Sequence, residues 1–260
     1  MRLGMSTAAF YGRGDTEELA ARMGDWGLDC CEVFLETPSE YTAAFGRVVR
    51  QALSGLECVS VHPMSSQFEA QLFAVYHRQR EDALRLFEGV CDAGQALGAR
   101  YYMLHGPFRT RGGLRLADVH DLEENTRALL RRARERDMEV LWENVSWCAL
   151  RGPEDVAWLR ARFPELGFVL DVKQATECGV APENMVRAMG PRLRHLHLMD
   201  RDGAGRLCLP GEGAVDWRVL RAALDEVGYA GAAILEPYEQ QAGDADRLRR
   251  SLDFLRGWLA

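Results

Sequence analysis

The chain alternates from end to end between short apolar runs and longer amphipathic segments. The eight apolar runs are Leu3–Ser6, Asp29–Leu35, Cys58–His62, Tyr101–His105, Glu139–Glu143, Gly167–Asp171, Leu193–His197 and Ala232–Glu236. Segments with helical spacing lie between and after them, most clearly at Arg78–Leu97 and Asp244–Leu259. Alternating strands and helices are typical of parallel sheets joined by right-handed crossovers. Eight strands with a helix after the last predict an α/β fold, the (β/α)8 or TIM barrel.

An open doubly wound sheet is the alternative to a closed barrel. That fold usually has fewer strands and a glycine-rich first turn, whereas the early glycines Gly12 and Gly14 do not form the GxGxxG pattern of nucleotide-binding proteins. The length of 260 residues suits one barrel, and the chain shows no linker, low-complexity tract or internal repeat. We therefore expect a single domain over residues 1–260.

Composition restricts the class of protein. No stretch approaches the roughly 20 apolar residues that span a bilayer, and the N-terminus lacks the apolar region of a signal peptide, so we expect a cytoplasmic protein without a membrane partner. The seven cysteines are scattered without a Cys-x-x-Cys pair, which favours reduced thiols. The net charge of −7 argues against an extended nucleic-acid interface. A small-molecule partner is the expectation, and the oligomeric state is left open.

Six consecutive apolar runs end in a side chain that can bind a metal ion. In chain order these side chains are His62, His105, Glu143, Asp171, His197 and Glu236. The carboxyl ends of barrel strands meet at one face, and that face carries the active site. Residues that lie far apart in the sequence are therefore expected at one mouth.

Each of these residues alone has an ordinary structural explanation. A single histidine at a strand end is often only hydrogen-bonded, and an acidic residue there is often the N-cap of the next helix. Six together are harder to explain, because each adds to the desolvation cost of the others. Three carboxylates in one pocket repel each other unless a cation lies among them. Mixed histidine and carboxylate ligands suit Mn²⁺, Zn²⁺, Co²⁺ or Mg²⁺ and do not discriminate among them.

Motifs around these residues resemble those of the xylose isomerase-like TIM barrels, which include sugar isomerases, ketose 3-epimerases, inosose dehydratases and endonuclease IV. The motifs that carry the resemblance are Val61-His62-Pro63, Leu104-His105-Gly106-Pro107, Glu143-Asn144, Leu170-Asp171, His195-Leu196-His197-Leu198-Met199-Asp200, Gly211-Glu212-Gly213 with Asp216-Trp217, and Glu236-Pro237. The resemblance extends over nearly the whole chain.

The resemblance implies a set of metal ligands. One divalent ion would be bound by Glu143, Asp171, His197 and Glu236, and a possible second ion or the substrate would contact His62 and His105.

The chain also departs from the family pattern. Gln174 stands where relatives often carry a histidine, three residues after Asp171. The segment Gly205-Arg206-Leu207 stands where endonuclease IV has the Asp-x-His pair of a third zinc site. A three-metal phosphodiesterase centre is therefore not supported.

The activity that the resemblance implies is proton transfer at a carbon next to a carbonyl, through an enediolate, on a polyhydroxylated substrate. Glu143 and Glu236 would serve as the base and the acid. Sugars, sugar phosphates and keto-inositols are candidate substrates, and isomerisation, epimerisation and dehydration share this first step. A metal-dependent phosphoester hydrolase of the endonuclease IV type and a non-catalytic binding barrel remain as alternatives.

A few further side chains are candidates for contact with the substrate. Lys173 and Gln174 directly follow Asp171, so they are expected to line the rim or to cap the next helix. Glu212 is expected to orient a ligand or to stabilise its loop. Arg206 could bind a phosphate or carboxylate, although solvated loop arginines are more common. His195 lies two residues before His197, so strand periodicity places it inside the barrel, one layer deeper.

Overall fold

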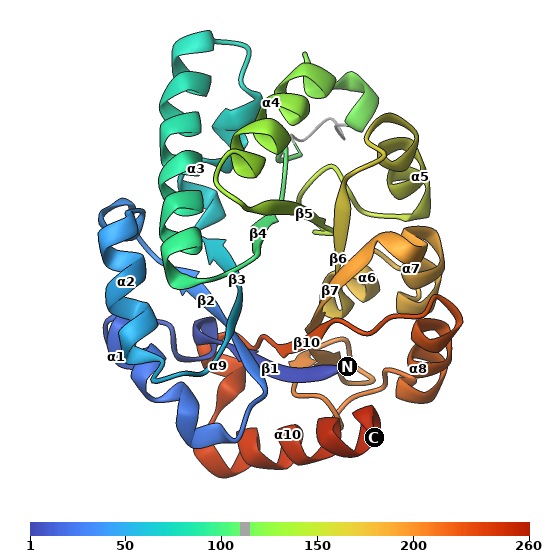
Figure 1. Ribbon diagram of the computed structural model, residues 1–260. Helices are drawn as coiled ribbons and strands as arrows, with labels where there is room; N and C mark the ends of the chain where they lie inside the picture. Colours follow the sequence, from blue (N-terminus) through green and yellow to red (C-terminus); the bar gives the residue numbers. More distant parts are fainter. Residues whose placement is uncertain (110–114) are drawn as a thin grey trace.

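A computed structural model describes residues 1–109 and 115–260 of the chain. Eight parallel strands close into a barrel, in the order β1-β10-β7-β6-β5-β4-β3-β2 (Figure 1). Their bounds are β1 Arg2–Ser6, β2 Cys30–Leu35, β3 Cys58–Pro63, β4 Tyr101–Leu104, β5 Glu139–Glu143, β6 Gly167–Asp171, β7 Leu193–Leu198 and β10 Ala232–Leu235. The prediction of a (β/α)8 barrel is therefore confirmed.

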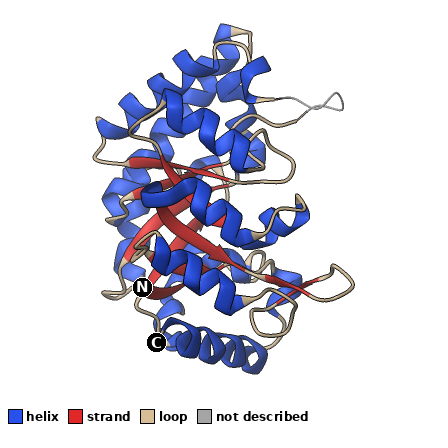
Figure 2. Ribbon diagram, turned by 90° about the vertical axis from the view of Figure 1, so that its right-hand side faces the viewer, coloured by secondary structure: helices blue, strands red, loops and turns tan. Residues whose placement is uncertain are grey.

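Helices follow the strands and surround them (Figure 2). They are α1 Thr16–Ala21, α2 Ala43–Ala52, α3 His77–Leu97, α4 Leu122–Arg134, α5 Pro153–Arg162, α6 Val172–Glu177, α7 Pro182–Met189, α8 Trp217–Glu226, α9 Glu239–Ala242 and α10 Ala245–Leu259. Their apolar faces pack on the outside of the barrel, where most of the core lies. Among the described residues, no helix is long and apolar enough to cross a membrane.

One element was not expected from the sequence. The segment after β7 forms a small antiparallel hairpin of β8, Asp200–Arg201, and β9, Leu207–Cys208. Two-residue strands are too short to show a period of two, so no pattern could have indicated them.

Strand periodicity aims the candidate ligands into the barrel. Met103, Leu141 and Val169 form a buried cluster separate from the main core. Side chains two residues apart on a strand point the same way. His105, Glu143 and Asp171 each lie two residues beyond a member of this cluster, so they extend the interior toward the carboxyl ends of the strands.

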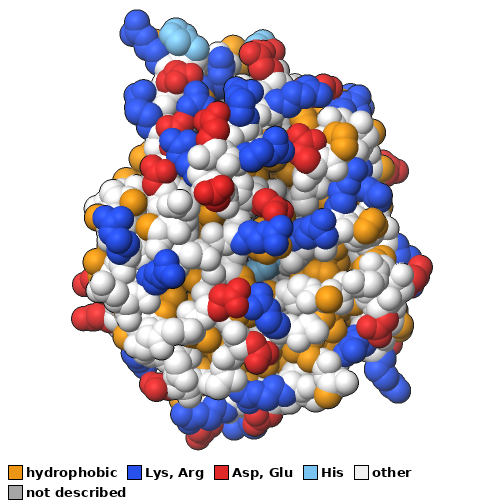
Figure 3. Space-filling view, viewed as in Figure 1, with side chains coloured by type: hydrophobic (Ala, Val, Ile, Leu, Met, Phe, Trp, Pro, Cys, Tyr) orange, Lys and Arg blue, Asp and Glu red, His pale blue; other side chains and the backbone are white. Residues whose placement is uncertain are grey.

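The surface mixes charges of both signs. On the face drawn in Figure 3, lysine and arginine side chains are interspersed with aspartate and glutamate side chains rather than gathered into one patch. Such a surface is typical of a protein that is solvated on this side.

Candidate functional site

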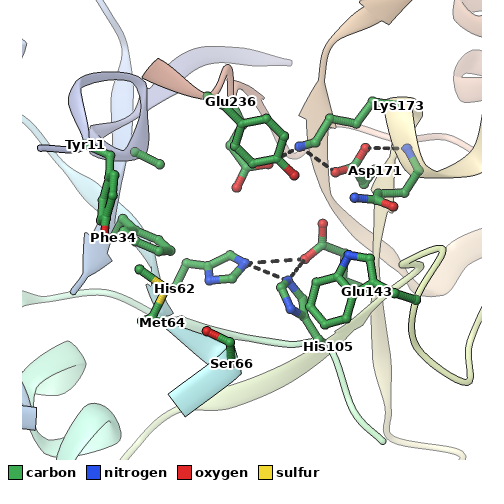
Figure 4. A pocket seen from close by; sticks show the side chains of 14 residues that line it. Tyr11, Phe34, His62, Met64, Ser66, His105, Glu143, Asp171, Lys173 and Glu236 are labelled. Atoms are coloured by element: carbon green, nitrogen blue, oxygen red, sulfur yellow. Dashed lines mark hydrogen bonds and ion pairs between the residues drawn. The ribbon is translucent and has the colours of Figure 1, made fainter. Parts of the chain in front are cut away.

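A cavity of about 290 Å³ lies at the carboxyl ends of the strands (Figure 4). Its polar lining comprises His62, Ser66, His105, Glu143, Asp171, Lys173, Gln174 and Glu236. Aromatic side chains, among them Tyr11, Phe34 and Tyr238, form another part of the wall. The cavity therefore collects five of the six predicted strand-end ligands, together with both residues predicted to follow Asp171 at the rim.

The sixth predicted ligand, His197, is fully buried on β7 and contacts Glu143 and Glu236. Its Nδ1 lies 3.0 Å from Glu143 Oε1 and 3.5 Å from Glu236 Oε2. Ligand atoms of Glu143, Asp171, His197 and Glu236 all lie within 4.8 Å of one another. We call these residues the four-ligand cluster. Their geometry allows one ion to contact all four.

A second group of ligands shares Glu143 with this cluster. His62 Nε2 and His105 Nε2 are 3.0 Å apart, and they lie 3.5 Å and 3.1 Å from Glu143 Oε2 (Figure 4). His62 Nδ1 lies 2.9 Å from the carbonyl oxygen of Pro63, which can only accept a hydrogen bond. The ring therefore donates from Nδ1 and turns Nε2 toward the cavity.

Backbone contacts fix the direction of Asp171. Its Oδ1 accepts the backbone N–H of Gln174 at 2.9 Å and so caps α6, while Oδ2 faces Lys173. Asn144, just after β5, donates to the Asp171 carbonyl and accepts the Asp171 N–H, both at 2.9 Å. The ends of β5 and β6 are thereby joined, which holds the carboxylates of Glu143 and Asp171 near each other.

Lys173 and Gln174 have different surroundings at the rim. Lys173 Nζ lies 2.8 Å from Asp171 Oδ2 and 2.6 Å from Glu236 Oε2. The side-chain oxygen of Gln174 accepts the backbone N–H of Ser146 at 2.9 Å, which leaves its amide NH₂ group for other partners. Gln174 thus takes part both in the cap of α6 and in the cavity wall, which are the two roles that the sequence left open.

The structure contains a buried acidic residue that the sequence analysis missed. Glu32, on β2, is fully buried and lies beneath the four-ligand cluster. Its Oε2 is 3.1 Å from His197 Nε2 and 3.3 Å from His195 Nε2, and it accepts the Ser60 hydroxyl at 2.8 Å. His195 points inward, as its spacing from His197 predicts. In the sequence, the only indication of this residue is that a carboxylate stands among the apolar residues that follow Asp29 in the run Asp29–Leu35.

Glu69 is a second buried carboxylate that was missed. It accepts the Tyr102 hydroxyl at 2.8 Å and the backbone N–H of His105 at 3.0 Å. These two bonds hold the start of the loop that carries His105, so Glu69 supports the site from outside the cavity lining.

Burial and neighbouring charges shift the pKa values in opposite directions across the site. Burial acts to raise the pKa of Glu143, but the charges of His197 and His105 outweigh it and hold this pKa well below its usual range. Burial, with help from Glu143 and Glu236, raises the pKa of Asp171 to about 6 despite the nearby Lys173. The pKa of Lys173 is raised well above its usual value, because Asp171 and Glu236 outweigh its burial.

Two predicted substrate contacts lie outside the cavity lining. Arg206 adjoins the β8–β9 hairpin with its side chain 81% exposed, and it pairs with Asp202 at 2.8 Å. Glu212 pairs with Arg247 of α10 at 2.6 Å and accepts the backbone N–H of Leu209. Neither residue lines the cavity. These contacts agree with the alternatives of a loop-stabilising Glu212 and a solvated Arg206, and contact of either residue with a substrate stays a prediction.

Solved structures with the same fold include several epimerases. A D-psicose 3-epimerase crystallised in the presence of D-fructose matches with a TM-score of 0.82 and 16% identity, covering 100% of this chain and 99% of that one. The 3-keto-D-glucoside 4-epimerase of E. coli matches with a TM-score of 0.77 and 17% identity, covering 99% of each chain. The IOLI protein, solved with a zinc atom, matches with a TM-score of 0.79 and 15% identity, covering 100% and 96%.

Sequence comparison gives a local relative and a family. The D-psicose 3-epimerase of Enterocloster bolteae is 40% identical over 58 residues, a match that spans 22% of this chain and 18% of the relative. The model of the xylose isomerase-like TIM barrels matches residues 19–258. The match covers most of the chain, in agreement with the closed barrel. The chain belongs to the family of xylose isomerase-like TIM barrels.

Proposed function

We propose that the protein is a divalent-metal-dependent sugar isomerase or epimerase that moves a proton at a carbon next to a carbonyl. The observation that carries this proposal is the four-ligand cluster, in which three carboxylates that line the cavity lie close to one another and to the buried His197. The proposal extends to sugar phosphates and keto-inositols as substrates, because they offer the same carbonyl beside a hydroxyl-bearing carbon.

The residues present fit a divalent ion. Glu143, Asp171, His197 and Glu236 are all buried, and Glu143 Oε2 has no well-aligned hydrogen bond despite its burial. Three carboxylates held this close repel one another, and a cation among them removes that cost. The mixed donor set suits Mn²⁺, Co²⁺, Zn²⁺ or Mg²⁺. His62, His105 and Glu143 offer a possible second site of three ligands.

The related proteins support the same chemistry. Two are named as epimerases of D-psicose and of a 3-keto-D-glucoside, and a third was solved with zinc. The local match at 40% identity is also to a D-psicose 3-epimerase. Epimerisation of a carbon next to a carbonyl can proceed by removal of a proton from one face of the substrate and return of a proton to the other.

The arrangement of Glu143 and Glu236 suits such a two-sided transfer. Glu143 ends β5 and Glu236 follows β10, and these strands are separated by β6 and β7 in the barrel. A bound ion would polarise the substrate carbonyl and so acidify the neighbouring C–H bond. In the proposed reaction, one carboxylate removes this proton and the other delivers a proton to the opposite face.

Other cavity residues would bind and shield the substrate. Lys173 and the amide of Gln174 present hydrogen-bond donors that suit hydroxyl and carbonyl oxygens. Tyr11, Phe34 and Tyr238 provide apolar surface on which the C–H face of a sugar can pack and which excludes water.

Deuterium uptake from D₂O into a panel of ketoses, aldoses and keto-inositols tests the proposal, with NMR as the readout. The Mn²⁺-loaded protein should exchange a carbon-bound hydrogen in at least one of them. Glu143→Gln should lower the exchange rate by about 10²–10⁴-fold, because a positioned acid–base group contributes that much. Metal content is measured in the same samples, since Glu143 is also a proposed ligand.

Exposed Glu139, which pairs with Arg100 at the start of the same strand, gives the matched control. Glu139→Gln should exchange at the wild-type rate. A metal-loaded protein that exchanges no hydrogen in any of these sugars, yet cleaves phosphoesters, would show that the hydrolase alternative is correct.

A further inference from the structure

Lys173 is a cation enclosed among the proposed metal ligands. Its side chain is only 3% exposed, and its ammonium contacts Asp171 Oδ2 at 2.8 Å and Glu236 Oε2 at 2.6 Å (Figure 4). The ammonium also lies over the ring of Tyr238, with Nζ 5.0 Å from the ring centroid. Among the described residues that line the cavity, Lys173 is the only lysine or arginine.

The ammonium and a divalent ion would converge on the same oxygen atoms. Asp171 Oδ1 is occupied by the backbone N–H of Gln174, so Oδ2 is the oxygen that faces the cavity and the one that Lys173 contacts. Glu236 Oε2 likewise lies 3.5 Å from His197 Nδ1, inside the four-ligand cluster, and accepts a hydrogen bond from Lys173. An ion bonded to these oxygens lies next to a fixed positive charge, which weakens its binding.

Charge balance explains why a buried ammonium is tolerated beside a proposed metal site. Glu143, Asp171 and Glu236 carry three negative charges when ionised, and a divalent ion leaves one of them uncompensated. The ammonium cancels that remaining charge if His197 is neutral. In the absence of an ion, the protonated His197 faces Glu143, and the ammonium remains the cation that pairs with the other two carboxylates, Asp171 and Glu236. A buried carboxylate group without such a partner is strongly unfavourable.

We propose that Lys173 acts as a built-in counter-cation for the four-ligand cluster. Its ammonium keeps the protein folded without metal, and it makes metal binding weak and exchangeable. This inference rests on the metal site of the proposed function. It predicts that removing the charge of Lys173 increases the affinity of the site for a metal ion. A residue with a merely structural role would have the opposite effect.

Calorimetric titration of the metal-free protein with Mn²⁺ measures this directly. Lys173→Met keeps the length of the side chain without its charge, and it should bind Mn²⁺ at least about tenfold more tightly than the wild type. Lys173→Arg keeps the charge and should stay within about threefold of the wild type. Equal or weaker Mn²⁺ binding by Lys173→Met would overturn the proposal.

Thermal unfolding tests the other half of the inference. The wild-type protein in EDTA should remain folded, whereas Lys173→Met in EDTA should melt roughly 10 °C lower and recover when Mn²⁺ is added. If the wild-type protein is unfolded in EDTA, the proposal is wrong. It is also wrong if Lys173→Met melts at the wild-type temperature in EDTA.

These measurements use no sugar, so they separate this inference from the proposed activity. If wild type and Lys173→Met bind Mn²⁺ equally, only the inference on Lys173 fails. If neither binds Mn²⁺, the proposed metal site fails and this inference fails with it. If only Lys173→Met binds Mn²⁺, the inference holds and the proposed metal dependence of the wild type fails.

Discussion

At the scale of single residues, the most informative side chain is a carboxylate sealed inside the barrel. Glu32 is fully buried, and one of its oxygens, Oε1, has no hydrogen-bond partner. Its other oxygen faces two histidines, whose charges outweigh burial and hold the pKa of Glu32 well below its usual range. Burying a carboxylate is costly, and the contacts of Glu32 Oε2 with His197, His195 and Ser60 offset part of that cost. The geometry makes Glu32 a positioning residue for His197.

The contact with Glu32 assigns the two ring nitrogens of His197. Nε2 lies 3.1 Å from Glu32 Oε2, while Nδ1 faces Glu143 and Glu236, so the protonated ring donates to carboxylates on both sides. A divalent ion would replace the proton on Nδ1, and the contact at Nε2 already holds the ring in the orientation that such binding needs. Partners of this kind tune a metal site without touching the ion.

Glu32→Ala should weaken Mn²⁺ binding by about 10–100-fold, because such a change releases the orientation of a ligand. Glu32→Gln retains an acceptor for Nε2–H and should lose less. Calorimetry of the folded variants gives the affinities. Ser60→Ala, which removes only a hydroxyl donor to Glu32, is the matched control and should bind nearly as the wild type. Unchanged affinity in Glu32→Ala would show that His197 is held by its other contacts.

The candidate ligands could be predicted from sequence because each ends an apolar run, and the ends of barrel strands converge. Glu32 lies inside its run, where the sequence does not say which alternate side chains face the barrel axis. The contacts of Lys173 with Asp171 and Glu236 depend on side-chain direction at the start of α6, which sequence spacing does not give. Arg206 was a candidate from its position after His197, but its partner Asp202 holds it at the hairpin.

At the scale of elements, the turn after β4 shows how tightly the barrel mouth is built. Gly106 follows His105 and has a φ of +79°, a conformation that residues with a side chain rarely adopt. A Cβ atom there would lie 2.4 Å from Cζ2 of Trp142. The indole N–H of Trp142 in turn donates to the His105 carbonyl at 3.2 Å. The turn is therefore fixed by both backbone conformation and packing.

Gly106→Ala should lower the free energy of unfolding by about 2–4 kcal/mol, because it combines backbone strain with overpacking against Trp142. Gly228 is a matched control, since its φ of +68° is similar but no atom lies within 4 Å of its ideal Cβ position. Gly228→Ala should cost only about 1–2 kcal/mol. Urea unfolding measures both. Equal losses in the two variants would mean that Trp142 moves aside without cost.

Element boundaries could be predicted where a local signal marks them. The run at Gly167–Asp171 coincides with β6, because its apolar residues are bounded by a strand-starting glycine and a capping aspartate. The β8–β9 hairpin could not be predicted, since its pairing is fixed by contacts such as the two backbone N–H groups that Asp200 Oδ1 accepts, from Arg201 at 2.8 Å and Val215 at 3.0 Å. Such contacts exist only once the fold has brought the loop together.

At the scale of the whole molecule, closure of the barrel joins the two ends of the chain. β1 pairs with β10 in parallel from Arg2–Ala232 to Met5–Leu235, which brings the first strand beside the last. Eight strands and a suitable length made closure predictable, but the register of this final pair is a long-range property. Helix α10 also joins the end of the chain to its first part, because Arg256 donates to the carbonyls of Trp26 and Gly27, which lie between α1 and β2.

The same helix packs against its neighbours through a buried apolar face. Leu255 is fully buried in the main core, and the ring of Trp258 lies 5.1 Å from that of Trp217 on α8. None of the described residues that line the cavity belongs to α10. Stability and metal binding should therefore be separable in this part of the molecule.

Leu255→Ala should lower the free energy of unfolding by about 2–5 kcal/mol, because it removes buried methyl groups and leaves a cavity. For a protein of this size, such a loss corresponds to a melting temperature roughly 5–15 °C lower. Mn²⁺ affinity of the folded variant should stay at the wild-type value, since the proposed ligands lie on or directly after β5, β6, β7 and β10 and none of them lies on α10. Asp246→Ala, at an 81% exposed position on the same helix, is the control and should change stability by less than about 0.5 kcal/mol. If Leu255→Ala loses Mn²⁺ binding while it remains folded, packing of α10 and the geometry of the site are coupled, and stability and metal binding are not separable.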